Sequence, residues 1–236
     1  MSEFFDNFEI DGYEDALNQN VGVEEIETAT PYLCVVAIDS SGSMCDYNDD
    51  NSGIMRDCLK NFQSSILHSK QADEILTAKI TFDDDVNIGG FVKPEDFDCS
   101  FTTGGWTALN DSIVAARKLI LDYMDQIRDS GGTPHGCLVI LSDGYNNASK
   151  ASDSDARRAI QELQKQEVAV AFITFGSGAA GVASNLGIKP KNIKDFNDNE
   201  RGLREALNMV SKSAISASKR ASAGLGNGDD AGYFDV

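Results

Sequence analysis

Oxygen-bearing side chains alternate along a short segment near the start of the chain. Residues 39–43 have the sequence D-S-S-G-S, and they follow an apolar, β-branched run at 33–38. Such a run predicts a buried parallel strand, which would bring the Asp39 carboxylate and the Ser41 and Ser43 hydroxyls together at its carboxyl end. Carboxylate, hydroxyl and solvent oxygens suit a hard cation such as Mg²⁺. The segment therefore predicts one part of a metal site.

Two later segments could supply the remaining ligands. Residues 102–109, T-T-G-G-W-T-A-L, form a glycine-rich loop that places Thr107 just before a helical pattern. Residues 137–144, C-L-V-I-L-S-D-G, predict a second buried strand with Asp143 at its end. Each segment also has a simpler interpretation, because Ser and Thr cap helices and Asp-Gly forms turns. The three segments together favour a metal site.

The elements that must position these residues alternate along the chain. We predict strands at 33–38, 76–82, 86–92, 137–141, 168–175 and 192–196, and helices at 53–70, 108–128, 154–166, 179–186 and 200–218. This alternation predicts an α/β fold with a doubly wound, mostly parallel six-stranded sheet flanked by helices. Ligands of such sheets bind outside the carboxyl ends of the strands, where the three segments would lie.

In these three segments the chain resembles the von Willebrand factor A (VWA) family, over about residues 32–213. The resemblance implies the strand order 3-2-1-4-5-6 and a metal-ion-dependent adhesion site (MIDAS). The ligands that it implies are Asp39, Ser41, Ser43, Thr107 and Asp143. It further implies that a Mg²⁺-type cation there binds an Asp or Glu carboxylate of a protein partner. Mn²⁺ is an alternative, and the hydroxyl-rich ligand set disfavours Ca²⁺.

Two residues next to the expected ligands are candidate partner contacts. Trp106 is the only tryptophan of the chain and stands where this family commonly has a small residue. It could anchor an interface, as tryptophan often does, or pack against the edge of the sheet. Asn146 follows Asp143 closely and would lie at the rim of the site, although turn formation explains it equally well.

The charge of the chain limits its partners. The formal net charge is −18, and residues 1–30 hold nine acidic and no basic side chains. This balance repels phosphate backbones, so nucleic acid is a poor partner. The start of the chain lacks the pattern of an export signal, no apolar run has membrane-spanning length, and the five cysteines show no C-x-x-C pair. We therefore expect a cytoplasmic protein that does not enter a membrane.

The chain divides into three parts by composition. Residues 1–30 form an acidic segment with several aromatic residues, either a docking segment or a short element laid against the domain. Residues 31–213 form the domain with the metal site. Residues 214–236 are rich in Ser, Ala, Gly and Asp, which predicts a flexible tail. Its last residues, Tyr233, Phe234 and Val236, could form a short binding motif, but a disordered terminus is the favoured interpretation.

The resemblance also narrows the functional context. The sequences G-G-W-T-A-L-N-D-S at 104–112 and S-D-G-Y at 142–145 are similar to those of tellurium-resistance-associated (TerY-like) proteins. This similarity implies a bacterial or phage protein that binds a partner in a stress or tellurium-resistance assembly. The alternative is a Mg²⁺-dependent phosphate-processing enzyme that uses Asp39 as nucleophile. The loops around the site contain no Lys, Arg or His to neutralise a phosphate, so a binding module is favoured.

Overall fold

The computed structural model describes residues 8–44, 51–175, 179–225 and 232–235, with the backbone alone at Ser43 and Asn51. The strands are β1 (Tyr32–Asp39), β2 (Ile75–Phe82), β3 (Val86–Ile88), β4 (His135–Ser142), β5 (Ala169–Phe175) and β6 (Ile193–Phe196). The helices are α2 (Tyr13–Gln19), α3 (Asn51–Leu67), α4 (Leu109–Asp129), α5 (Asp153–Lys165), α6 (Ala179–Asn185) and α7 (Glu200–Ser222). Short 3₁₀ helices lie between them: η1 (Val23–Glu25), η2 (Gly42–Met44), η3 (Ala72–Glu74), η4 (Pro94–Asp96) and η5 (Pro190–Asn192).

The strands form one six-stranded sheet in the order β3-β2-β1-β4-β5-β6. Only the edge pairing of β2 with β3 is antiparallel, and the other four pairings are parallel. This topology confirms the predicted fold and strand order. It also brings the carboxyl ends of the central strands β1 and β4 side by side, because β1 pairs with β4 in parallel register from Tyr32↔His135 to Ile38↔Leu141.

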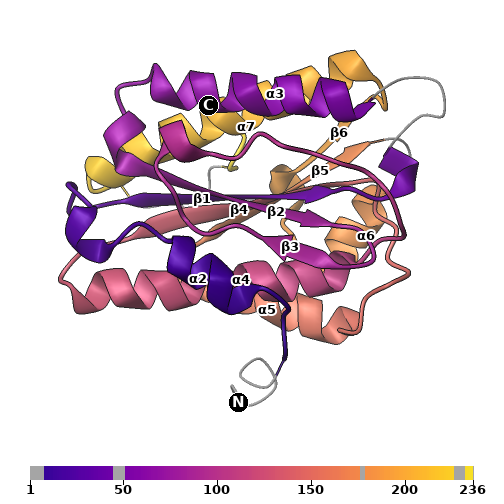
Figure 1. Cartoon of the computed structure of the whole chain (residues 1–236), viewed down its shortest axis with the longest axis horizontal. Helices are drawn as coiled ribbons and strands as arrows, with labels where there is room; N and C mark the ends of the chain where they lie inside the picture. Colours follow the sequence, from indigo (N-terminus) through magenta and orange to yellow (C-terminus); the bar gives the residue numbers. More distant parts are fainter. Residues whose placement is uncertain (1–7, 45–50, 176–178, 226–231, 236) are drawn as a thin grey trace.

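Helices cover both faces of the sheet (Figure 1). The helices α3 and α7 lie over one face, and α2, α4 and α5 lie over the other. Every residue of β1 is buried, and its side chains alternate between the two hydrophobic cores: Leu33, Val35 and Ala37 on the α4 side, and Cys34, Val36 and Ile38 on the α7 side. This two-sided burial explains why the strand is a continuous apolar run. None of the described helices combines the length and the apolar character that crossing a membrane requires.

The predicted third strand is too long. The ladder of β3 stops at Ile88. Beyond it, the pairing with β2 is reduced to a hydrogen bond from the Gly89 amide to the Lys79 carbonyl and an isolated bridge between Val92 and Thr77. The cause is the packing of α2, because the backbone of Gly90 lies against that of α2. A Cβ at Gly90 would meet the carbonyl oxygen of Ala16 and, at 2.9 Å, the amide nitrogen of Asn20. The Asn20 side chain then accepts a hydrogen bond from the Phe91 amide at 2.7 Å.

The acidic amino-terminal segment forms a short element against the domain, where it is described. The Tyr13 side chain of α2 is buried, and its hydroxyl donates to Asp122 of α4 at 2.7 Å. Phe8 and Ile10 pack against the same core, whereas the earlier Phe4 and Phe5 lie outside the described residues.

The prediction of a flexible tail at 214–236 is wrong for the described residues. Helix α7 continues to Ser222, and beyond it Tyr233 and Phe234 are buried in the core on the α7 side. The Tyr233 amide donates to the side-chain oxygen of Asn192 at 2.8 Å, and its hydroxyl lies 3.2 Å from the Cys137 sulfur. In Figure 1 this last segment lies between α7 and the sheet. Residues 226–231 and Val236 lie outside the described residues.

Candidate metal centre

Asp39 is the last residue of β1, and its side chain is completely buried. One carboxylate oxygen accepts a hydrogen bond from the Ser41 amide at 2.9 Å, and the other accepts one from the Ser142 hydroxyl at 2.6 Å. Burial raises the pKa of the Asp39 carboxyl to about 6, although the hydrogen bonds from Ser142 and Ser41 oppose this rise. The negative charge of Asp143 is a smaller contribution to the same rise in pKa. The folded chain therefore holds the Asp39 carboxylate in a buried position that disfavours its ionised form.

The loops after β1 and before α4 are joined through their backbones. The Gly104 amide donates to the Ser40 carbonyl at 2.8 Å, and the Gly42 amide donates to the Gly105 carbonyl at 3.2 Å. Ser41 is buried within this junction. Ser43 lies in η2, the turn that follows, and only its backbone is described. The glycine-rich loop that carries Thr107 therefore lies directly against the D-S-S-G-S segment.

Thr107 is fixed to the loop that follows β4. Its amide donates to the side-chain oxygen of Asn147 at 2.8 Å, and its carbonyl accepts from the Asn147 and Ala148 amides at 3.0 and 3.1 Å. Thr107 is buried, and Asp143 at the start of the same loop is half-buried. The structure thus brings Asp39, Ser41, Thr107 and Asp143 to one end of the sheet.

The side chains at this end of the sheet fit a divalent cation. The Asp39 carboxylate is buried next to the negative charge of Asp143, and residues 39–44, 102–109 and 143–149 contain no Lys, Arg or His. Among the described residues, no group of three or more His, Cys, Asp or Glu side chains could hold a metal ion instead. Two carboxylates with Ser and Thr hydroxyls are oxygen ligands of the kind that hard cations prefer.

The sequence did not reveal several side chains that hold these loops in place. Ser142 not only donates to Asp39 but accepts from the Gly144 amide at 3.0 Å. The buried carboxylate of Asp111, in the first turn of α4, accepts from the Ala151 and Lys150 amides at 2.7 and 3.0 Å. Asp84, in the turn between β2 and β3, accepts from the Trp106 amide at 3.1 Å. The contact of this turn with the Trp106 loop depends on the tertiary fold, because the two residues are 22 positions apart in the chain.

The two candidate partner contacts both lie on the surface. Trp106 is 66% exposed, so it does not pack against the edge of the sheet. Asn146 is also exposed, and its side-chain oxygen accepts a 2.5 Å hydrogen bond from the Ser149 hydroxyl, as a turn residue would. Tyr145, which lies between Asp143 and Asn146 in the sequence, is also 66% exposed.

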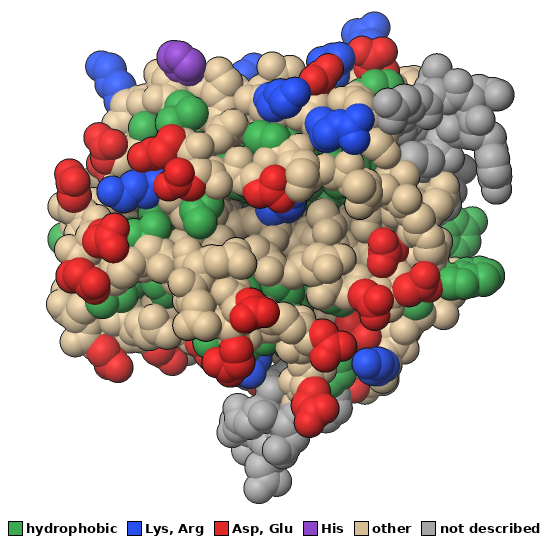
Figure 2. Space-filling model, viewed as in Figure 1, with side chains coloured by type: hydrophobic (Ala, Val, Ile, Leu, Met, Phe, Trp, Pro, Cys, Tyr) green, Lys and Arg blue, Asp and Glu red, His purple; other side chains and the backbone are tan. Residues whose placement is uncertain are grey.

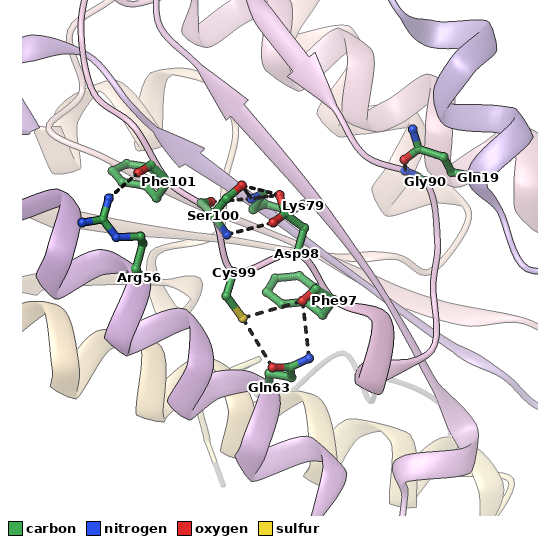
Figure 3. Close-up of polar contacts among 10 residues, drawn as sticks. All are labelled: Gln19, Arg56, Gln63, Lys79, Gly90, Phe97, Asp98, Cys99, Ser100 and Phe101. Carbon is green, nitrogen blue, oxygen red and sulfur yellow. Dashed lines mark hydrogen bonds and ion pairs between the residues drawn. The ribbon is translucent and has the colours of Figure 1, made fainter.

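The connection from β3 to the Thr107 loop is held by polar contacts (Figure 3). Lys79 of β2 binds the Asp98 carboxylate at 2.6 Å and the Ser100 carbonyl at 2.5 Å. The Gln63 side chain of α3 donates to the Phe97 carbonyl, and Arg56 of the same helix donates to the Phe101 carbonyl at 3.2 Å. A groove of about 440 Å³ lies beneath this connection, lined in part by Thr77, Lys79, Thr81 and Asn87. These contacts fix the path of the chain just before the glycine-rich loop.

The strand order and the position of the buried Asp39 at the end of β1 define a VWA-type fold. A matching structure is the vWF domain of the type V pili tip protein Mfa5 from Porphyromonas gingivalis, with a TM-score of 0.60 and 12% sequence identity. That match covers 85% of this chain and 98% of the other chain. No protein-family model matches the sequence, and no curated protein matches it.

Two further structures with the same fold contain a metal. Proximal thread matrix protein 1 from the mussel byssus, with a zinc-occupied MIDAS motif, matches with a TM-score of 0.59 and 18% identity over 80% of this chain. Manganese-loaded TRAP protein of Plasmodium vivax matches with a TM-score of 0.53 and 16% identity over 79% of this chain. This chain spans 47% of the mussel protein and 74% of the Plasmodium protein, and as little as 30% of another matching chain.

Proposed function

We propose that this chain is a metal-dependent protein-interaction module. In the proposal, Asp39, Ser41, Ser43, Thr107 and Asp143 hold a divalent cation, and an Asp or Glu carboxylate of a protein partner binds to that cation. The observation that carries the proposal is the buried Asp39 carboxylate, whose charge no cationic side chain of the surrounding loops compensates. A bound cation would supply the missing positive charge.

The choice of cation follows from the ligands. Mg²⁺ accepts hydroxyl and water oxygens beside few carboxylates, so it is the cation that we propose, with Mn²⁺ as the alternative. Ca²⁺ takes more oxygen ligands and fits less well. The zinc and manganese in the mussel and Plasmodium proteins support a divalent cation in this fold.

An enzymatic role for Asp39 has less support. Both of its oxygens already accept hydrogen bonds, and a nucleophilic carboxylate that attacks phosphate also needs a cationic side chain to neutralise the phosphate. The TerY-like context, the tellurium-resistance assembly and the cytoplasmic location stay predictions from the sequence.

Titration calorimetry of Mg²⁺ and Mn²⁺ into chelator-treated protein tests the metal site. We expect saturable binding by the wild type and none by Asp39→Asn, which keeps the side-chain volume. The variant Asp125→Asn, on the exposed face of α4, is the matched control and should bind as the wild type does. Equal binding by all three proteins would refute the proposed ligands. Mg²⁺-dependent hydrolysis of a phosphate ester that Asp39→Asn abolishes would favour the enzyme instead.

A further inference from the structure

Two exposed aromatic side chains belong to the two loops that carry the proposed ligands Thr107 and Asp143. Trp106 directly precedes Thr107, and Tyr145 lies two residues after Asp143. Each is 66% exposed, and the other exposed large hydrophobic residues described are the aliphatic Leu67 and Leu225. Exposed aromatic residues on one rim are typical of an interaction site, and Trp and Tyr are the residue types that most often anchor interfaces.

The backbone at both aromatic residues is held relative to the site. The Trp106 amide donates to Asp84 at 3.1 Å, and the Tyr145 amide donates to Asp143 at 3.3 Å. The paired hydrogen bonds between Thr107 and Asn147 join the two loops. A partner would therefore meet two aromatic residues whose backbone positions are already fixed, which reduces the entropy lost on binding.

The charge around the two aromatic residues differs between the two loops. Trp106 lies next to Asp84, and both Asp84 and Asp85 are exposed in the turn that touches the Trp106 loop. Figure 2 shows acidic and hydrophobic side chains along the right-hand edge of the molecule, where Figure 1 places the carboxyl ends of the strands. At Tyr145, the backbone amide donates to the Asp143 carboxylate, whose charge a bound cation would share.

We infer that Trp106 and Asp84 together select a positively charged side chain next to the metal-binding carboxylate of the partner. Arginine fits best, because its flat guanidinium stacks on an aromatic ring while its N–H groups bind a carboxylate. The same Asp84 charge repels an acidic neighbour. Tyr145 adds contact area without this preference. The inference rests on the proposed function and specifies its partner as a segment in which Asp or Glu adjoins Arg or Lys.

Four synthetic pentapeptides test this preference in the presence of saturating Mg²⁺. In three of them, a central Asp is flanked on both sides by Arg, by Gln or by Glu. In the fourth, a central Asn lies between two Arg residues. All four peptides begin and end with Gly. Binding is measured by calorimetry and, in proteins that retain it, by the fluorescence of Trp106, the single tryptophan. We expect the Arg-Asp-Arg peptide to bind about fivefold more tightly than Gln-Asp-Gln, and Glu-Asp-Glu to bind most weakly.

Three variants separate the contributions of the side chains. Trp106→Ala and Asp84→Asn should bind Mg²⁺ as the wild type does but lose the preference for Arg over Gln. The side-chain amide introduced by Asp84→Asn can still accept the hydrogen bond from the Trp106 amide, so the loop should keep its path. Tyr145→Ala is the matched control, because it removes an equally exposed aromatic ring; it should weaken all Asp peptides by the same factor.

The outcomes distinguish the inference from the proposed function. Equal affinity of the three Asp peptides for the wild type, or an Arg preference that persists in Trp106→Ala, would overturn the inference alone. Equal binding of the Asn and Asp peptides, binding that does not require Mg²⁺, or no peptide binding by the Mg²⁺-loaded protein would overturn the proposed function itself.

Discussion

Replacing Asp39 by Asn should stabilise the metal-free protein. Asn has nearly the same volume as Asp, and its side-chain oxygen can still accept the hydrogen bond from the Ser41 amide. Its NH2 group replaces the oxygen that accepts from the Ser142 hydroxyl, so that hydrogen bond is lost and makes the expected gain an upper value. It differs in carrying no charge at a position that is completely buried. The substitution therefore removes the cost of holding a carboxylate away from water while leaving the packing almost unchanged.

The magnitude follows from the pKa of Asp39. Its rise from 3.8 to about 6 corresponds to about 3 kcal/mol, at about 1.4 kcal/mol per pKa unit. Because the folded-state pKa is the higher one, the cost is present in full above about pH 6. It declines as the pH falls through 6 toward the unfolded value, and at pH 5 about half of it remains. The gain from Asp39→Asn should therefore be largest in neutral or alkaline buffer.

Urea denaturation in chelator at pH 8 and pH 5 measures this gain. We expect Asp39→Asn to exceed the wild type by up to about 3 kcal/mol at pH 8 and by about half as much at pH 5. Added Mg²⁺ should then stabilise only the wild type, by about 2.7 kcal/mol at a hundred times the dissociation constant. The control is Asp125→Asn, which removes an exposed carboxylate of α4 and should leave the free energy of unfolding almost unchanged at both pH values. An Asp39→Asn variant no more stable than the wild type in chelator at pH 8 would refute the reasoning.

Three other substitutions test the surroundings of the site. Phe234→Ala should lower the free energy of unfolding by about 3 kcal/mol in urea denaturation, because the ring is buried, whereas Leu225→Ala at an exposed position should not. An unchanged stability of the Phe234 variant would show that the tail does not pack. Lys79→Met should weaken Mg²⁺ binding in calorimetry by loosening the connection to the Thr107 loop, whereas Lys60→Met, which breaks an exposed ion pair, should not. Asp111→Asn keeps only one side-chain oxygen, so one of the two backbone amides that donate to Asp111 loses its acceptor. The free energy of unfolding should fall by about 1–3 kcal/mol in thermal denaturation, and a smaller loss would mean that water replaces the lost hydrogen bond.

The fold could be predicted because its central strands have an unambiguous pattern. Strands buried on both faces are continuous apolar runs. β1 ends in Asp39, and β4 ends in Ser142, which Asp143 follows, at the same edge of the sheet. Since the carboxyl ends of adjacent parallel strands must meet, these runs place Asp39 and Asp143 together without knowledge of the loops.

The supporting contacts could not be predicted, since they join segments far apart in the chain. Nothing local in the sequence connects Asp84 with the Trp106 amide, or Asn147 with Thr107. The prediction of a flexible tail was wrong for a different reason. Its average composition is that of a flexible segment, but burial depends on individual side chains, and Tyr233 and Phe234 suffice to hold the chain end in the core.

Three locally unfavourable features coincide at the carboxyl ends of β1 and β4. The Asp39 charge is buried, the Ser40 hydroxyl is buried without a hydrogen-bond partner among the described residues, and two aromatic rings are exposed beside them. Natural sequences depart from local consistency mainly where function requires it. A cation would relieve the buried charge and a bound partner would cover the rings, so a single metal-bound complex accounts for two of the three departures. Two unrelated activities would each leave one of them unexplained.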